Sequence, residues 1–375
     1  MRNHGFGGSS TGAGVGAVWR MNCSSAATIA AASAGEAPGA TISSCGRRFG
    51  MGRNLPRSLR ARLPELPVLD RDAVLAAVSP EAAIAAVRDG FVRHRRGEWV
   101  MPSKVYLDSP PHGDFRAMPA RGGDLAILKW ISSFPSNPER GLPTVIGLLV
   151  VSDATTSEPL ALMDAGAVTA LRTGAVAAVA SDALAAGRSV GVVGCGLHGA
   201  WAARCLAAAG YGPGVCFDPR PEAAQALAAE LGWRAGAHAD AMGADVVCCV
   251  TPGHAPVVEI GDLHAGLHLN MLGADGPGKA EATVGAVASC ALFCDEWEQA
   301  SHGGELTGAI EAGMVRREQV TDLGAVLTGE ARGRPGPEAV TLFDSTGLAI
   351  QDLAVAGAAL EAYRGGAVEA QVVRV

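Results

Sequence analysis

The stretch that decides the fold is Ser189-Val-Gly-Val-Val-Gly-Cys-Gly-Leu-His-Gly199. The apolar run at 189–193 predicts a short buried strand, and Gly194-x-Gly-x-x-Gly199 then opens a helix through Ala209. The first glycine permits a tight turn, the second lets backbone approach a pyrophosphate, and the third permits close packing of helix on strand. The start of the helix offers free N–H groups to phosphates. The stretch therefore predicts a dinucleotide-binding βαβ unit.

The next predicted strand, 215–218, ends at an acid, Asp218. A carboxylate at this place accepts hydrogen bonds from both ribose hydroxyls and repels a 2′-phosphate, so NAD is preferred over NADP. Arg220, two residues further on, would instead pair with that phosphate, which leaves NADP open.

Strands and helices alternate beyond this unit, with a helix over 221–231 and strands over 245–250, 267–272 and 290–295. This alternation predicts an α/β fold with a doubly wound parallel sheet, a Rossmann domain at 187–320. Residues 66–96 have a helical pattern, with Ser79-Pro80-Glu81 as a helix start. Short β-like runs follow over 100–160, then an Ala-rich helix near 165–186. A strand at 340–343 and a final helix from Gly347 complete the chain. We assign 63–186 and 321–375 to a second, split α+β domain.

The composition excludes several classes of protein. In 375 residues, 49% are hydrophobic and 18% charged, which excludes a wholly disordered chain. The net charge of −7 argues against a nucleic-acid surface, and each long apolar run is interrupted by a charge or by glycines, so we expect no membrane span. Residues 1–62 hold eight Arg and one acid, and predict a disordered N-terminal extension. A transit peptide or a later start of translation are alternatives for this segment.

The nine cysteines show no metal-binding spacing. We therefore expect no metal site and reduced thiols in a cytoplasmic protein. Lysine is rare, since Lys104, Lys129 and Lys279 are the three lysines in the chain, among 30 basic residues outside His. Because most basic residues of the chain are Arg, the three Lys suggest positions where a compact ammonium has a role that a planar guanidinium does not fill.

Five segments in order resemble the ornithine cyclodeaminase/μ-crystallin family, and the resemblance runs from about 66 to 360. They are Lys129–Val145, Pro159–Asp164, Leu171–Ala175, Gly273–Lys279 and Phe343–Gly347. The resemblance implies a substrate-binding and dimerisation domain, split around an NAD-binding Rossmann domain, in a homodimer.

The resemblance also implies residue roles. Catalytic roles fall to Asp275, as acid/base, and Lys129. Substrate contacts fall to Lys104, Arg116, Arg172 and Thr346. Cofactor contacts fall to Thr144, Arg172, Gly194, Gly196, Leu197, His198, Gly199, Asp218, Thr251, Leu272, Gly273, Lys279 and Ser345. His198-Gly199 stands where the family has Gln-Ala, so the contacts of this loop stay open.

The residues suit hydride removal from the α-carbon of an amino acid. Lys104, Lys129 and Arg172 would hold the carboxylate and lower the proton affinity of the amine, while Asp275 takes a proton or activates water. The plainer alternative for Asp275 is an Asx turn in a Gly/Pro loop.

Arg116 bears on the choice of reaction. Ornithine-type members carry an acid at the place of Arg116, which suits a cationic substrate tail, whereas Arg116 would repel such a tail. An outward Arg116 paired with Asp114 or Glu98 is the alternative. We expect an NAD-dependent amino-acid dehydrogenase or imine reductase, similar to the alanine-dehydrogenase-like members, for a small or acidic substrate. A cyclodeaminase that uses NAD catalytically and a non-catalytic ligand-binding protein of μ-crystallin type stay as alternatives.

Overall fold

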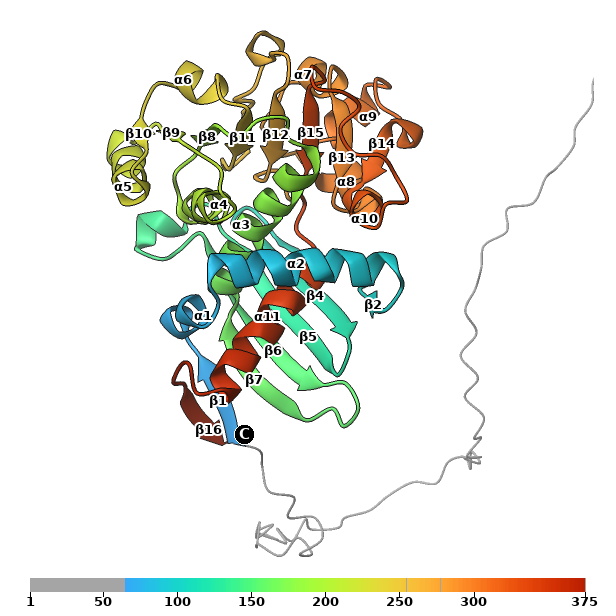
Figure 1. Ribbon diagram of the computed structural model, residues 1–375. Coiled ribbons are helices and arrows are strands. Elements are labelled where there is room, and N and C mark those ends of the chain that lie inside the picture. The colour runs from blue at the N-terminus through green and yellow to red at the C-terminus, as the bar shows by residue number, and fades with distance from the viewer. Residues whose placement is uncertain (1–64, 254, 277, 375) are drawn as a thin grey trace, which may run out of the picture. The chain divides into compact units, whose positions relative to one another are not determined.

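The computed structural model describes residues 65–253, 255–276 and 278–374, so the predicted disordered extension at 1–62 lies outside the described residues. Within them the chain builds two eight-stranded sheets (Figure 1). The helices are α1 (Arg71–Ala77), α2 (Pro80–Arg95), α3 (Ala165–Leu184), α4 (Leu197–Ala208), α5 (Pro221–Leu231), α6 (His238–Met242), α7 (Val284–Ala288), α8 (Trp297–Gly303), α9 (Thr307–Glu311), α10 (Leu323–Leu327) and α11 (Ala349–Arg364).

The first sheet is mixed, and β1 and β7 form its parallel pair. Its order is β16 (Gln371–Arg374), β1 (Glu65–Leu69), β7 (Pro159–Asp164), β6 (Val145–Asp153), β5 (Leu125–Ser133), β4 (Gly113–Gly122) and β2 (Trp99–Val100), with β3 (Val105–Ser109) also paired to β4. The helical pattern predicted from residue 66 is wrong at its start. Residues 65–69 form a strand because β7 and β16 pair with them on either side, and such distant partners are not visible in local periodicity.

The second sheet is parallel throughout, as predicted for a doubly wound fold. Its order is β10 (Arg234–Ala235), β9 (Gly214–Phe217), β8 (Val190–Val193), β11 (Val246–Cys249), β12 (His268–Met271), β15 (Thr341–Asp344), β13 (Ala291–Cys294) and β14 (Val320–Asp322). The predicted return of the whole segment 321–375 to the other domain is wrong. Strand β15 lies between β12 and β13, with Phe343 opposite Asn270 and Phe293, whereas α11 and β16 pack with the first sheet. A short buried strand has the same local pattern in either sheet, so pairing decides where it belongs.

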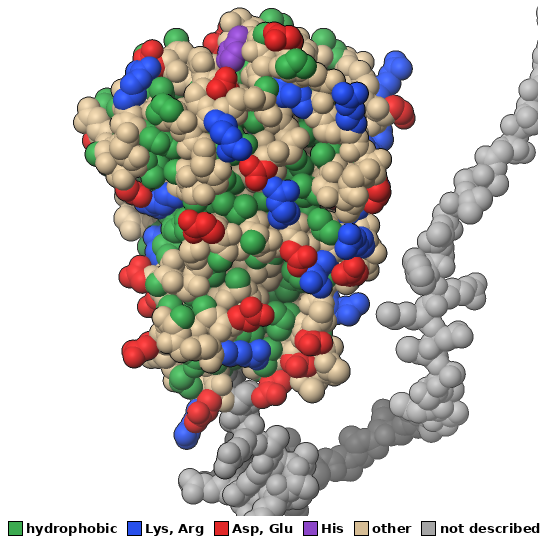
Figure 2. Space-filling view, in the orientation of Figure 1, with side chains coloured by type: hydrophobic (Ala, Val, Ile, Leu, Met, Phe, Trp, Pro, Cys, Tyr) green, Lys and Arg blue, Asp and Glu red, His purple; other side chains and the backbone are tan. Residues whose placement is uncertain are grey.

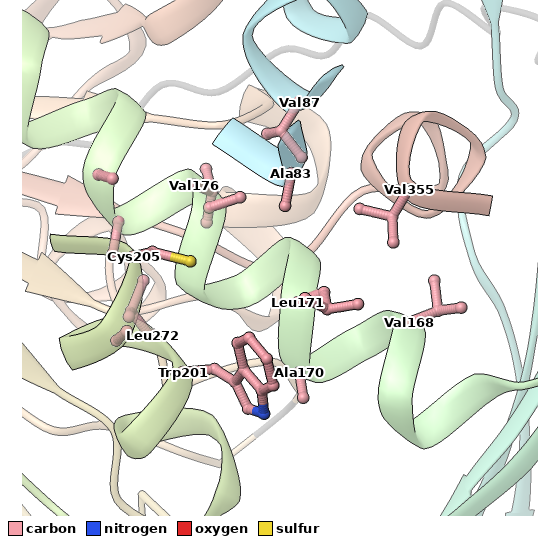
Figure 3. Close-up of a cluster of buried hydrophobic side chains, with 14 of the residues drawn as sticks. Ala83, Val87, Val168, Ala170, Leu171, Val176, Trp201, Cys205, Leu272 and Val355 are labelled. Carbon is pink, nitrogen blue, oxygen red and sulfur yellow. The ribbon is translucent and has the colours of Figure 1, made fainter. Parts of the chain in front are cut away.

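Helix α3 packs against helices from both halves of the fold. Its N-cap is Asp164, whose carboxylate accepts a hydrogen bond from the Ala167 N–H at 2.6 Å. By length and hydropathy α3 alone among the described helices could cross a membrane, but 89% of its apolar window is buried inside the protein, as in a core helix. A Cβ on Gly174 would collide with the Trp201 carbonyl of α4, so glycine permits the close approach of the two helices. Figure 3 shows side chains of α3 between those of α2, α4 and α11.

Candidate active site

The glycine-rich loop between β8 and α4 has the geometry of a phosphate cradle. Gly194 has a φ of 98°, which a residue with a side chain rarely adopts, and a Cβ on Gly199 would collide with the Gly194 carbonyl. A Cβ on Gly196, the N-cap of α4, would meet nothing within 4 Å, so this side of the loop is open. No side chain caps the first turn of α4, so its N–H groups stay available to an anion. These residues fit a dinucleotide pyrophosphate.

Asp218 lies at the end of β9, beside this loop. Its carboxylate accepts hydrogen bonds from the Cys195 N–H at 2.9 Å and from the Arg220 guanidinium at 3.0 and 3.1 Å. Burial opposes ionisation of Asp218, but the Arg220 side chain and the backbone N–H groups of Arg220 and Cys195 hold its pKa below the ordinary value. Because Arg220 neutralises Asp218, the charge argument against a 2′-phosphate is weaker than the sequence indicates.

A buried carboxylate that the sequence analysis missed holds together two loops with predicted cofactor contacts. Glu281 is fully buried and accepts hydrogen bonds from the Thr251 N–H at 2.6 Å and the Gly273 N–H at 2.7 Å. Glu305 in turn accepts hydrogen bonds from the N–H groups of Glu281 and Ala282. No sequence signal separates Glu281 from an ordinary loop acid, because its partners are backbone groups of distant loops.

One cavity brings together many of the predicted site residues. The predicted residues that line it are Lys104, Arg116, Lys129, Arg172, His198, Leu272, Asp275, Ser345 and Thr346. The predicted residues that do not line it are Thr144, Gly194, Gly196, Leu197, Gly199, Asp218, Thr251, Gly273 and Lys279. Residues that the sequence analysis missed also line it, namely Met118, Ile131, Ser132, Ser133, Val145, Thr169 and Thr173.

Asp275 lies in the loop after β12, between two cations. Its Oδ2 is 2.6 Å from Nη1 of Arg116, and its Oδ1 is 2.6 Å from Nζ of Lys279. Burial alone would raise the pKa of Asp275, but Arg116, Lys279 and Lys104 lower it well below the usual range. Arg116 is buried and also pairs with Asp114 at 2.6 Å, so it faces inward rather than toward solvent. Asp275 is therefore a fixed carboxylate at neutral pH.

The two cavity lysines have depressed pKa values. Burial lowers the pKa of Lys104 to about 8, assisted by Arg116 and Arg172, and Lys104 Nζ donates a hydrogen bond to the Thr346 carbonyl at 2.5 Å. Burial and the neighbouring Arg172 likewise lower the pKa of Lys129 to about 8, against the attraction of Asp352. Both amines therefore change charge near neutral pH, unlike an exposed lysine.

His198, at the start of α4, lines the same cavity. Burial lowers the pKa of its imidazole to about 4, and the charge of Arg172 acts in the same direction. The ring is therefore neutral at neutral pH and offers one donor and one acceptor nitrogen.

The lining has one carboxylate, Asp275, and four cationic side chains on β4, β5, α3 and the segment before β3. Such a cavity suits a small anion, with Asp275 as an acceptor for an amine or a water. Among the described residues, no group of three or more His, Cys, Asp or Glu could hold a metal ion.

Residues 67–367 match the profile of the ornithine cyclodeaminase/mu-crystallin family. The chain belongs to this family. An alanine dehydrogenase of Archaeoglobus fulgidus is 39% identical over 301 residues, which cover 78% of this chain and 93% of that protein. An iminosuccinate reductase of Paracoccus denitrificans is 32% identical over 311 residues, 79% of this chain and 96% of that protein. A solved archaeal alanine dehydrogenase dimer with bound NAD superposes with a TM-score of 0.78 at 38% identity, over 83% of this chain and 99% of that one.

These comparisons confirm the predicted family and the predicted α/β fold class. Relatives of this ornithine cyclodeaminase/mu-crystallin family member are dehydrogenases, reductases and cyclodeaminases, and the chain is an enzyme of that group.

Proposed function

We propose that this enzyme uses NAD to transfer a hydride at the α-carbon of a small amino acid or its imine. The observation that carries the proposal is the convergence of Lys104, Lys129, Arg172 and Asp275 on one cavity. His198 lines that cavity too, and it belongs to the glycine-rich loop that fits a dinucleotide, so the cavity adjoins the cofactor cradle. NAD would supply the hydride acceptor or donor at this junction.

The residues divide the work by charge. The ammonium groups of Lys104 and Lys129 and the guanidinium of Arg172 bind the substrate carboxylate and disfavour a protonated amine nearby. Asp275, held ionised by Arg116 and Lys279, accepts a hydrogen bond from the amine or directs a water at the α-carbon. Arg116 lines the cavity at the place where ornithine-type members carry an acid, so the acid that would bind a cationic substrate tail is missing, which favours alanine or an acidic substrate over ornithine.

The experiment compares L-alanine with L-ornithine in the presence of NAD⁺. Net NADH absorbance from alanine supports the proposal, whereas proline and ammonia from ornithine without net NADH would replace it with a cyclodeaminase. Asp275→Asn should lower kcat about 1,000-fold and leave NADH affinity within about threefold. Asp114→Asn is the matched control, because Asp114 also pairs with Arg116 but does not line the cavity. Equal losses in both variants would remove Asp275 from the chemistry.

We propose further that two copies associate through the open face of the first sheet. Helices α2 and α11 cover the face seen in Figure 1, and the space-filling view shows charges of both signs interspersed there (Figure 2). The other face exposes apolar side chains of β3, β5 and β6, namely Val105, Leu107, Leu128, Trp130, Ile146 and Leu148. Trp130 and Leu148 are opposite each other in the register, so the exposed residues form one apolar patch. A second copy is the occupant favoured by the dimeric state of the archaeal alanine dehydrogenase structure.

A further inference from the structure

Two of the four cations that line the cavity, Lys129 and Arg172, share one buried carboxylate, Asp352 on α11. Asp352 is fully buried, and its Oδ2 lies 2.7 Å from Nζ of Lys129, which is 1% exposed. Its other oxygen, Oδ1, lies 3.6 Å from Nε of Arg172. Each oxygen therefore faces a different cation. Asp352 itself does not line the cavity, so it acts on the cavity only through Lys129 and Arg172.

Within the described part of the chain, no other bonding partner explains the burial of Asp352. Neither carboxylate oxygen accepts a hydrogen bond from backbone or from a neutral side chain among the described residues. A carboxylate without such bonds is expensive to bury, and an apolar pair in place of a buried ion pair is often at least as stable. Stability alone therefore does not account for Asp352, whereas the charge of Lys129 does.

The groups that face Lys129 leave Asp352 as the anion that balances its charge. Arg172 on α3, Arg116 on β4 and His198 on α4 are further charged or titratable groups that act on Lys129 or are acted on by it, and Thr169 contributes a hydroxyl at 3.3 Å. Lys104 and Asp275 line the same cavity, but Asp275 is already paired with Arg116 and Lys279. Burial, Arg172 and Arg116 all lower the pKa of Lys129, and Asp352 raises it. Without Asp352, the amine would therefore lose its proton more readily.

We propose that Asp352 is a positioning residue, which keeps Lys129 protonated and directs both Lys129 and Arg172 toward the substrate carboxylate. The part of this role that concerns the substrate rests on the proposed function, because it requires that the bound substrate has a carboxylate. The first turn of α11 holds Asp352, and the positive end of this 16-residue helix stabilises the ionised carboxylate. The segment 345–348, between β15 and α11, is held in turn by Asp295, which accepts a hydrogen bond from the Gly347 N–H at 2.9 Å.

The rarity of lysine allows a direct test. Lysine labelled with ¹³C at Cε gives signals from three residues, Lys104, Lys129 and Lys279, which Lys→Arg variants assign. In Asp352→Asn, the titration midpoint of Lys129 should fall by at least about one pH unit, a tenfold loss of proton affinity. Glu305→Gln removes a buried carboxylate elsewhere and should leave the Lys129 midpoint within about 0.3 unit. An unchanged Lys129 midpoint in Asp352→Asn would overturn the proposal.

Kinetics and stability complete the test. Asp352→Asn should raise KM for the amino acid about 30-fold or more and change kcat less, because it acts on carboxylate binding. If Asp352→Asn fails to fold, a comparison of Tm between Lys129→Met and Lys129→Met/Asp352→Asn replaces it.

Lys129→Met leaves the buried carboxylate of Asp352 without its close partner. The double variant, which also removes this charge, should therefore have a higher Tm than Lys129→Met. No gain in Tm would contradict the pairing. The NMR titration does not require turnover. A wild-type protein that is inactive on amino acids would therefore refute the proposed function but not the effect of Asp352 on Lys129.

Discussion

The two faces of the first sheet are built from alternate residues of the same strands, yet one forms a polar cavity wall and the other an apolar surface. On β5, Ile127, Lys129 and Ile131 are buried beneath the helices, whereas Leu128 and Trp130 are each 43% exposed. The covered face can hold a charge because α11 supplies a buried counter-ion, Asp352, at 2.7 Å. On the open face the apolar residues stay exposed, because no helix of residues 65–374 that the structure describes covers them. A strand therefore serves two purposes at once, because successive side chains point to opposite sides.

The largest expected effect comes from the covered face. Lys129→Met/Asp352→Asn removes the ammonium together with its counter-ion, so the protein should fold while kcat/KM for the amino acid falls about 1,000-fold, or about 4 kcal/mol. Steady-state kinetics measure the loss. Leu128→Met, one residue away on the open face, is the matched control and should stay within about twofold. Comparable losses in both variants would break the distinction between the faces.

The second effect comes from the open face. Trp130→Glu places a charge in the proposed interface and should weaken dimerisation at least about 100-fold, because a buried unpaired charge costs several kcal/mol. Light scattering should then give the 37.9 kDa mass of one chain in place of twice that value. Arg93→Glu, on the exposed side of α2, is the control charge change and should leave the mass unaltered. A dimer that survives Trp130→Glu would remove the open face as the interface.

The smallest effect is a pH dependence of carboxylate binding at the covered face. Lys104 and Lys129, both with pKa values of about 8, are charged below that pH and lose their protons above it. The affinity of the NADH complex for acetate should therefore be highest below pH 8 and fall about tenfold by pH 9.5, as charge-assisted bonds are lost. Calorimetry over pH 6.5–9.5 measures it. A constant affinity across this range would show that neither lysine binds the carboxylate.

Local patterns were sufficient for much of the fold. The glycine-rich loop, strand β8 and the Ser79 helix start were all predictable, because each depends on neighbouring residues. Strand β1 was predicted as helix, and β15 was assigned to the wrong half of the chain. Both errors have the same cause, since the pairing partners of these strands are far away in the sequence.

The candidate site divides in the same way. Motifs indicated Lys129, Arg172 and Asp275, and the structure places all three around one cavity. Glu281 carried no comparable signal, because an acid in a loop is usually solvated and nothing local indicates burial. No motif assigned a role to Asp352.

The sequence by itself determined the supply of chemical groups, with three lysines in an arginine-rich chain, a glycine-rich turn after a strand, and an acid in a glycine-rich loop. Only the tertiary structure decided which charges meet. It set Asp275 between Arg116 and Lys279, and Asp352 behind Lys129. The physical reason is that the pKa of a buried group depends on neighbours a few ångströms away in space, whatever their separation along the chain.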